Sequence, residues 1–221
     1  MNKMILSSCA LIFLAVSALC SCATTQGKTE QDRAAVEQKG YSKQPEHHFM
    51  AAHENFLNKE YKEAGDEIRK SAESLRQRSE RATEETKEAL KSSARELDEL
   101  ADSVEKGTET SISHLEDTFA RAHYALAKYY NEKASASYVK KEYKKAGYEL
   151  KASAMYLKNG MTWAGSKAEE GTESAMDESR RLGDKLIQGS GWTADEFGKG
   201  ISYLGDEIKK FGKTIEGTKN N

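Results

Sequence analysis

The sequence predicts an all-α protein, an elongated helical bundle built on two duplicated helical hairpins and completed by a C-terminal amphipathic helix. Three observations predict this class. The stretch at 59–75 recurs at 141–157, and the two copies are identical at most positions. The chain is 32% charged, with a mean hydropathy of −0.80, and no run alternates β-branched and polar residues as a strand does. Small and apolar residues instead recur at steps of three and four, which is the helical period.

The N-terminus has the pattern of an export signal. Lys3 provides a positive start, and residues 10–19 form an apolar run that is too short to cross a bilayer, which needs about 20 residues. The next feature is the tetrapeptide Leu-Cys-Ser-Cys at 19–22, which resembles a bacterial lipobox. This resemblance implies a lipoprotein signal peptide at 1–21 and lipidation of Cys22 with fatty acids such as palmitate. Ala23 in place of Asp implies sorting to the outer membrane, on its periplasmic face. An ordinary signal peptide cut before Cys22 is the alternative.

The cysteines and the segment after them agree with this interpretation. The last Cys of the chain is Cys22, so the mature chain has no disulfide and neither a catalytic thiol nor a cysteine-ligated zinc. Residues 22–46 contain few large apolar side chains and the single proline, Pro45. Such a segment cannot bury enough surface to offset the cost of ordering it. We therefore expect a lipidated Cys followed by a flexible tether, which holds the folded part away from the membrane.

Residues 47–190 are predicted to form the duplicated hairpin domain. We expect Tyr61 and Tyr143 to be largely buried at the elbows of the two hairpins. Glycine inside a helix costs about 0.5–1 kcal/mol relative to alanine. The matching Gly65 and Gly147 therefore predict close approach of the two helices within each hairpin.

Two loose resemblances accompany the hairpins. Tyr61, Ala64 and Ile68 resemble the second half of a tetratricopeptide unit, as do the equivalent residues of the second copy. The pairing of a short apolar helix with a polar, Ala-rich one resembles the YfdX-type bacterial envelope proteins. Neither resemblance implies catalytic residues.

The segment between the copies carries a seam of small and apolar residues with helical spacing. Gly107 is the predicted break in this seam, and Ser111 or Ser113 can cap the helix that follows. After the second copy, the glycines at 189 and 191 predict the end of a helix, and Thr193 can cap the last one.

Residues 191–221 are predicted to form that last helix and a tail. Its isoleucines and its Phe and Leu residues each repeat with a heptad period, as in a coiled coil. Gly198, Gly205 and Gly212 follow the same period and provide a flat flank for another helix. We expect docking on the protein's own body. Pairing with a second copy or another helical protein, and binding to a membrane surface, are the alternatives.

The polar residues predict no cofactor and no metal. His47, His48 and His53 do not share the i, i+4 spacing that places two ligands on one helix face, so we expect partly exposed histidines. His123 has no acid at ligand spacing. The net charge of −2 argues against nucleic acid as a partner.

These patterns favour a non-enzymatic role. We expect a membrane-tethered structural or interaction lipoprotein of the bacterial envelope, of a kind induced under stress, whose partner is another envelope protein or a second copy. The alternative is a carrier that holds a small apolar ligand in a groove between the hairpins. The residues expected to line that groove are Tyr124, Tyr130, Tyr156 and Trp163.

Overall fold

The computed structural model describes residues 44–166 and 169–217, and this part of the chain is helical without any strand, which confirms the all-α class. The helices are α2 (Gln44–Leu57), α3 (Tyr61–Ser79), α4 (Glu84–Glu105), α5 (Ile112–Val139), α6 (Tyr143–Trp163), α7 (Glu170–Gln188) and α8 (Ala194–Gly217). None of them is long and apolar enough to cross a membrane. The predicted signal peptide and Cys22 lie outside the described residues.

The predicted tether extends too far into the folded part. Helix α2 begins at Gln44, so the last residues assigned to the tether are helical. Pro45 lies in the first turn of this helix, where an N–H would have no partner within the helix and a fixed φ is already suitable. The proline therefore lies at the start of the first described helix.

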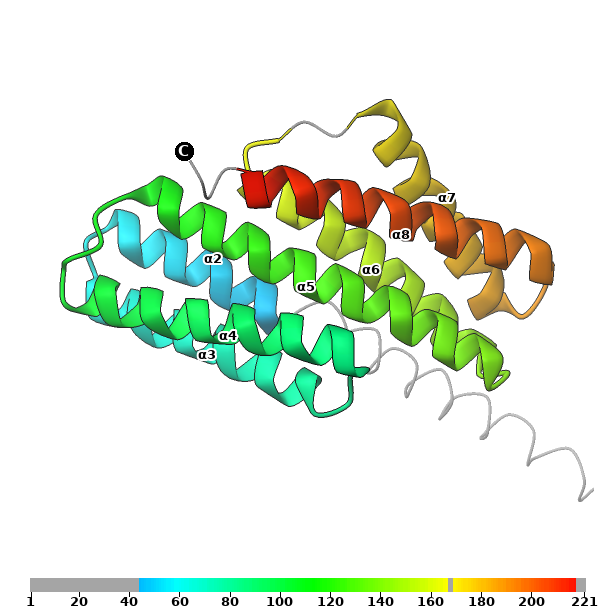
Figure 1. Ribbon diagram of the computed structural model, residues 1–221, viewed down its shortest axis with the longest axis horizontal. Helices are drawn as coiled ribbons and strands as arrows, with labels where there is room; N and C mark the ends of the chain where they lie inside the picture. The colour runs from blue at the N-terminus through cyan, green and yellow to red at the C-terminus, as the bar shows by residue number, and fades with distance from the viewer. Residues whose placement is uncertain (1–43, 167–168, 218–221) are drawn as a thin grey trace, which may run out of the picture. The chain divides into compact units, whose positions relative to one another are not determined.

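The bundle contains two three-helix units of matching geometry. We call α2, α3 and α4 (residues 44–105) the first unit, and the end of α5 with α6 and α7 (residues 126–187) the second unit. The units are related by one constant shift in numbering, the same shift that relates Lys59 to Lys141. In both units the middle helix packs on the helix before it and on the helix after it, and α8 lies along α5 and α7 (Figure 1).

The two elbows have the same backbone. Lys59 and Lys141 have φ values of 64° and 62°, a left-handed conformation that is uncommon outside glycine. The Lys59 N–H donates to the carbonyl of Phe56 at 3.0 Å, and the Lys141 N–H donates to the carbonyl of Tyr138 at 2.9 Å. Each hairpin thus turns with the same hydrogen bonds. A common origin of the two copies stays a prediction.

The two elbow tyrosines have matching surroundings. Tyr61 and Tyr143 are both partly buried and pack against the hydrophobic core. Tyr61 packs edge-on against Phe56, with the ring centroids 5.7 Å apart, and Tyr143 packs in the same way against Tyr138 at 5.3 Å.

The repeated glycines mark close helix contacts, although the contacted helix is not the expected one. A Cβ on Gly65 would lie 3.2 Å from the carbonyl oxygen of Ala101 in α4, and a Cβ on Gly147 would lie 2.5 Å from that of Gly183 in α7. The glycines therefore face the helix that follows, not the one that precedes. Because successive residues turn by about 100° around a helix, Gly65 points away from the face that Ala64 turns toward the core.

In both units, the residue four positions after the glycine forms an ion pair with the helix that follows. Arg69 of α3 donates to Asp102 of α4 at 2.8 Å, and Lys151 of α6 donates to Asp184 of α7 at 2.5 Å. The match between the units thus extends to their third helices, beyond the stretch at 59–75 in which the sequence repeat is evident.

Helix ends lie where the sequence places them. Helix α4 ends just before Gly107, which has a φ of 66°, and the Ser111 hydroxyl accepts a hydrogen bond from the N–H of His114 at 3.2 Å. Helix α7 ends at Gly189 with a φ of 77°, and the Thr193 hydroxyl accepts from the N–H of Glu196 at 3.1 Å. The predicted breaks and caps are therefore confirmed.

Helix α8 docks on the body, as predicted. Its buried apolar residues are Phe197, Leu204, Ile208, Phe211 and Ile215. Gly205 and Gly212 face α5, where a Cβ would lie 3.0 Å from Nδ2 of Asn131 and 2.7 Å from the ring of Tyr124, respectively. Gly198 meets nothing within 4 Å, so its predicted contact is wrong, and Gly200 instead approaches α7. A heptad repeat drifts against the helical period of about 3.6 residues, which moves Gly198 off the contact face.

Candidate functional site

The polar contacts of α2 centre on Glu46 in its first turn. Oε2 of Glu46 accepts a hydrogen bond from Nε2 of His123 in α5 at 2.6 Å and another from Nδ2 of Asn159 in α6 at 2.9 Å. His123 is fully buried, and its Nδ1 lies 2.7 Å from the carbonyl oxygen of Phe119. One carboxylate thus joins the start of α2 to two core helices.

The contacts of Glu46 lower the pKa of its carboxyl group. Burial raises the pKa of Glu46, but the hydrogen bond and charge of His123, with the bond from Asn159, outweigh burial and leave the pKa below its ordinary value of 4.5. Glu46 is therefore an acceptor at neutral pH, and the Phe119 carbonyl can only accept. Nε2 of His123 lies beside this carboxylate and Nδ1 lies beside the Phe119 carbonyl oxygen, so each ring nitrogen of the buried imidazole has a polar partner.

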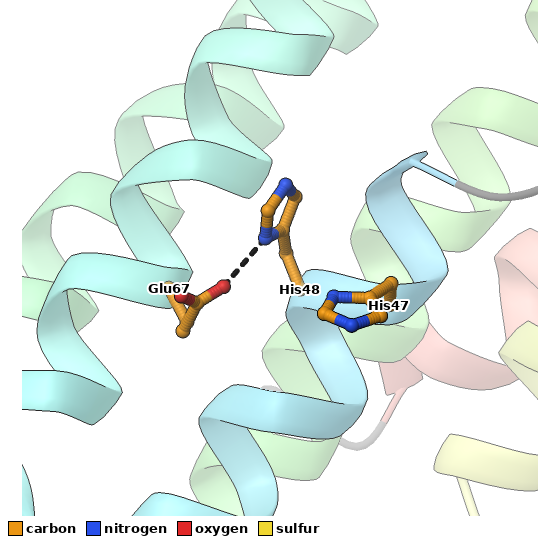
Figure 2. A group of neighbouring side chains, drawn as sticks. All are labelled: His47, His48 and Glu67. Carbon is orange, nitrogen blue, oxygen red and sulfur yellow. Dashed lines mark hydrogen bonds and ion pairs between the residues drawn. The ribbon is translucent and has the colours of Figure 1, made fainter. Parts of the chain in front are cut away.

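The second polar contact of α2 is formed by His48. Its Nδ1 lies 2.5 Å from Oε2 of Glu67 in α3 (Figure 2). The other carboxylate oxygen of Glu67 accepts a hydrogen bond from Nζ of Lys70 at 2.6 Å. Burial raises the pKa of Glu67, but the bonds from Lys70 and His48 outweigh it and lower the pKa overall. Farther along α2, Nε2 of His53 lies 3.0 Å from Oε1 of Glu116 in α5. Histidine–carboxylate pairs therefore connect this helix to its neighbours in its first two turns and near its end.

The same region contains the metal-ligand cluster of the described residues. Donor atoms of His47, His48 and Glu67 all lie within 4.8 Å of one another. Sequence reasoning missed this cluster and also missed the acid beside His123, because Glu67 and Glu46 lie 19 and 77 positions from their histidine partners. No local spacing could have indicated either pairing, since the helix packing brings the residues together.

The four aromatic residues of the predicted ligand groove do not share one groove. Tyr130 and Tyr156 are buried and stack with their ring centroids 5.4 Å apart and their planes 7° apart. Trp163 packs edge-on against Phe119 at 5.3 Å. Tyr130 and Tyr156 are therefore part of the packed core, and Trp163 is partly buried against it.

Tyr124 lies elsewhere, between α5 and α8. It lines a cavity of about 360 Å³ together with Asn131, Ile201 and Gly205. Lys128 and other charged residues form the rim of this cavity, so its lining is mixed in polarity and not apolar.

Two other buried acids differ in how fully their carboxylate oxygens are hydrogen-bonded. Glu207 of α8 accepts from Oγ1 of Thr172 and from Nζ of Lys210, both at 2.5 Å, and so joins α7 to α8. Glu149 of α6 is only 1% exposed, and burial raises its pKa despite a hydrogen bond from Ser137. Glu149 occupies the position of the second unit that corresponds to Glu67.

The features of this region are thus the hydrogen-bonded contact between Glu46 and His123, the group of possible metal donors and the cavity beside Tyr124. None of these features indicates a known relative, and neither does comparison with protein families, curated proteins and solved structures, which finds no match for this chain.

Proposed function

We propose that this chain is a lipid-anchored structural or protein-interaction lipoprotein of the bacterial cell envelope, held at the periplasmic face of the outer membrane. The observation that carries the proposal is the lipobox-like tetrapeptide ending at Cys22, followed by a polar segment that leads to a helical body. Two or more acyl chains hold a protein firmly at a membrane where a single chain binds only marginally. The helical body is then available for contact with a partner.

The arrangement of buried polar groups supports a binding role. Glu46 accepts hydrogen bonds from side chains on α5 and α6. Glu207 accepts from a side chain on α7 and from another one turn along α8. Carboxylates engaged in this way hold helices together and have little capacity left for proton transfer to a substrate. Their arrangement favours a rigid body over an active site.

The elbows supply a surface for a partner. Leu57 and Val139 occupy equivalent positions just before the two elbows, and they are 60% and 78% exposed. Exposed apolar residues are common singly. Their recurrence at the same position of both hairpins is consistent with contacts to another envelope protein or to a second copy.

A carrier of small ligands is the second candidate, and the cavity beside Tyr124 is the observation that favours it. At about 360 Å³ this cavity is within the range of small-molecule sites, although such sites have mostly apolar walls. A carrier should retain its ligand through purification, and native mass spectrometry would then show the added mass. An interaction protein should give the mass of the protein alone.

Substitution of Cys22 tests the anchor. We expect Cys22→Ala to remove fatty-acid labelling and to move the protein from the membrane fraction to the soluble fraction. Cys20→Ala is the matched control and should remain labelled and membrane-bound. A Cys22→Ala protein that is still acylated and still sediments with membranes would contradict the proposal.

A further inference from the structure

We propose that His47, His48 and Glu67 form a binding site for a divalent transition-metal ion of the zinc class. The two histidines lie in the first turns of α2, and the glutamate comes from the facing side of α3 (Figure 2). Their donor atoms lie within 4.8 Å of one another. The inference goes beyond the proposed anchoring and interaction role and does not depend on it.

The donor set selects the class of ion. Two imidazole nitrogens and one carboxylate oxygen suit zinc, copper or nickel, whereas magnesium and calcium prefer oxygen ligands alone. Three protein ligands leave a fourth tetrahedral position for water or another small ligand. The site is therefore of the open kind and not the closed structural kind.

Small movements bring these atoms to coordinating geometry. Zinc holds its nitrogen and oxygen ligands at about 2.0–2.2 Å, so tetrahedral ligand atoms lie roughly 3.3 Å apart. Nδ1 of His48 and Oε2 of Glu67 are now 2.5 Å apart, and an ion between them would separate them slightly. His47 is exposed near the start of α2, so coordination requires its ring to turn toward the other two donors.

Lys70 sets the orientation of the carboxylate. Its Nζ donates to Oε1 of Glu67 at 2.6 Å, which leaves Oε2 to face the histidines. Partners of this kind orient metal ligands in proteins and influence affinity. The Lys70 side chain is 55% exposed, so its charge is screened by solvent and can move away from a bound cation.

The second unit provides an internal comparison. The positions equivalent to His47, His48 and Glu67 hold Tyr129, Tyr130 and Glu149. Glu149 lies on α6 and the tyrosines on α5, as Glu67 lies on α3 and the histidines on α2, and the two elbows that join these helices have the same backbone. The backbone framework is therefore common to both units, and the metal-binding side chains occur in the first unit alone.

Binding would fasten α2 to α3. Helix α2 follows the predicted tether directly, and its other polar contacts are the pairs at Glu46 and His53. An ion held by two residues of α2 and one of α3 stabilises the packed helices over separated ones by mass action.

The test is zinc titration of the purified full chain, without a polyhistidine tag and after removal of metal with a chelator. Isothermal calorimetry should show one zinc ion bound per chain, no heat with magnesium or calcium, and a zinc-dependent rise in the melting temperature. Glu67→Gln keeps the size of the side chain and removes the charge of the ligand. We expect this variant, and His48→Gln, to bind zinc at least about 10-fold more weakly, since changes even to outer-shell partners cost roughly 10–100-fold.

His53→Gln is the matched control, because it removes another histidine–glutamate pair of the same helix outside the cluster. It should bind zinc as tightly as the parent. Equal affinity in the parent and in Glu67→Gln would overturn the site, since the ion would then be held adventitiously by surface histidines. Loss of binding in His53→Gln, or no binding by the parent, would overturn it as well.

Discussion

Replacing Gly147 with alanine is expected to destabilise the protein by up to about 2 kcal/mol, because inserting atoms into a packed core typically costs about 1–3 kcal/mol and better helix propensity offsets part of this. The added Cβ would lie 2.5 Å from the carbonyl oxygen of Gly183 and 2.9 Å from Cγ1 of Ile187. The first of these atoms belongs to the backbone, so α6 and α7 must separate to accept the methyl group. This cost exceeds the gain of about 0.8–1.0 kcal/mol in helix propensity from glycine to alanine.

Alanine substitutions at two other glycines provide a comparison, because they are expected to change stability differently. A Cβ on Gly198 meets nothing within 4 Å, so Gly198→Ala should stabilise the protein by about 0.5–1 kcal/mol. Gly65→Ala should fall between the two, because its Cβ would lie 3.2 Å from the Ala101 carbonyl oxygen. Urea unfolding followed by circular dichroism gives the three values. A Gly147→Ala protein as stable as Gly198→Ala would mean that α6 and α7 do not approach as closely as described.

Removal of the Glu46 carboxylate is expected to cost about 1–3 kcal/mol, the usual loss when a buried polar group is left without its hydrogen-bond partner. Glu46→Ala leaves Nε2 of the fully buried His123 without its acceptor and removes a bond from Asn159. The matched control is Glu116→Ala, which breaks the more exposed pair with His53 and should cost less than about 1 kcal/mol. Similar losses in the two variants would contradict the special role of Glu46.

The pH dependence of that loss has a definite sign. Because the folded protein holds the pKa of Glu46 below 4.5, the carboxylate contributes stability above that pH and loses its contribution as pH falls through the folded value. The difference in unfolding free energy between parent and Glu46→Ala should therefore shrink in acid. A difference that grows as the pH falls below 4.5 would mean that the carboxyl group is not ionised in the folded state.

Much of the fold follows from local patterns. Gly107 and Gly189 end helices because each takes a positive φ there, and the hydroxyls of Ser111 and Thr193 cap the helices that follow. These features depend on neighbours within a few residues, and a sequence shows such neighbours directly. The burial of Ile68 and its equivalents on one helix face follows in the same way from spacing.

The rest depends on which helices become neighbours. The sequence shows Gly65 as a site of close approach, but the contacted residue, Ala101, lies on a helix that local spacing cannot select. Local composition assigns Glu46 to a flexible segment because its neighbours are polar, and only packing against α5 and α6 gives it buried partners. The metal donors come together for the same reason, since Glu67 lies on a different helix from the histidines.

In-cell photo-crosslinking tests the proposed role most directly. A photoreactive residue at Leu57 or Val139, the exposed positions before the two elbows, should give a discrete adduct with an envelope protein or a second copy. The same group at Glu88, an exposed position on α4, should give none, and Cys22→Ala should abolish the adduct because the body then leaves the membrane. The account predicts an adduct that depends on both the elbow position and the anchor. Absence of any adduct at either elbow, or an adduct that persists without Cys22, would contradict it.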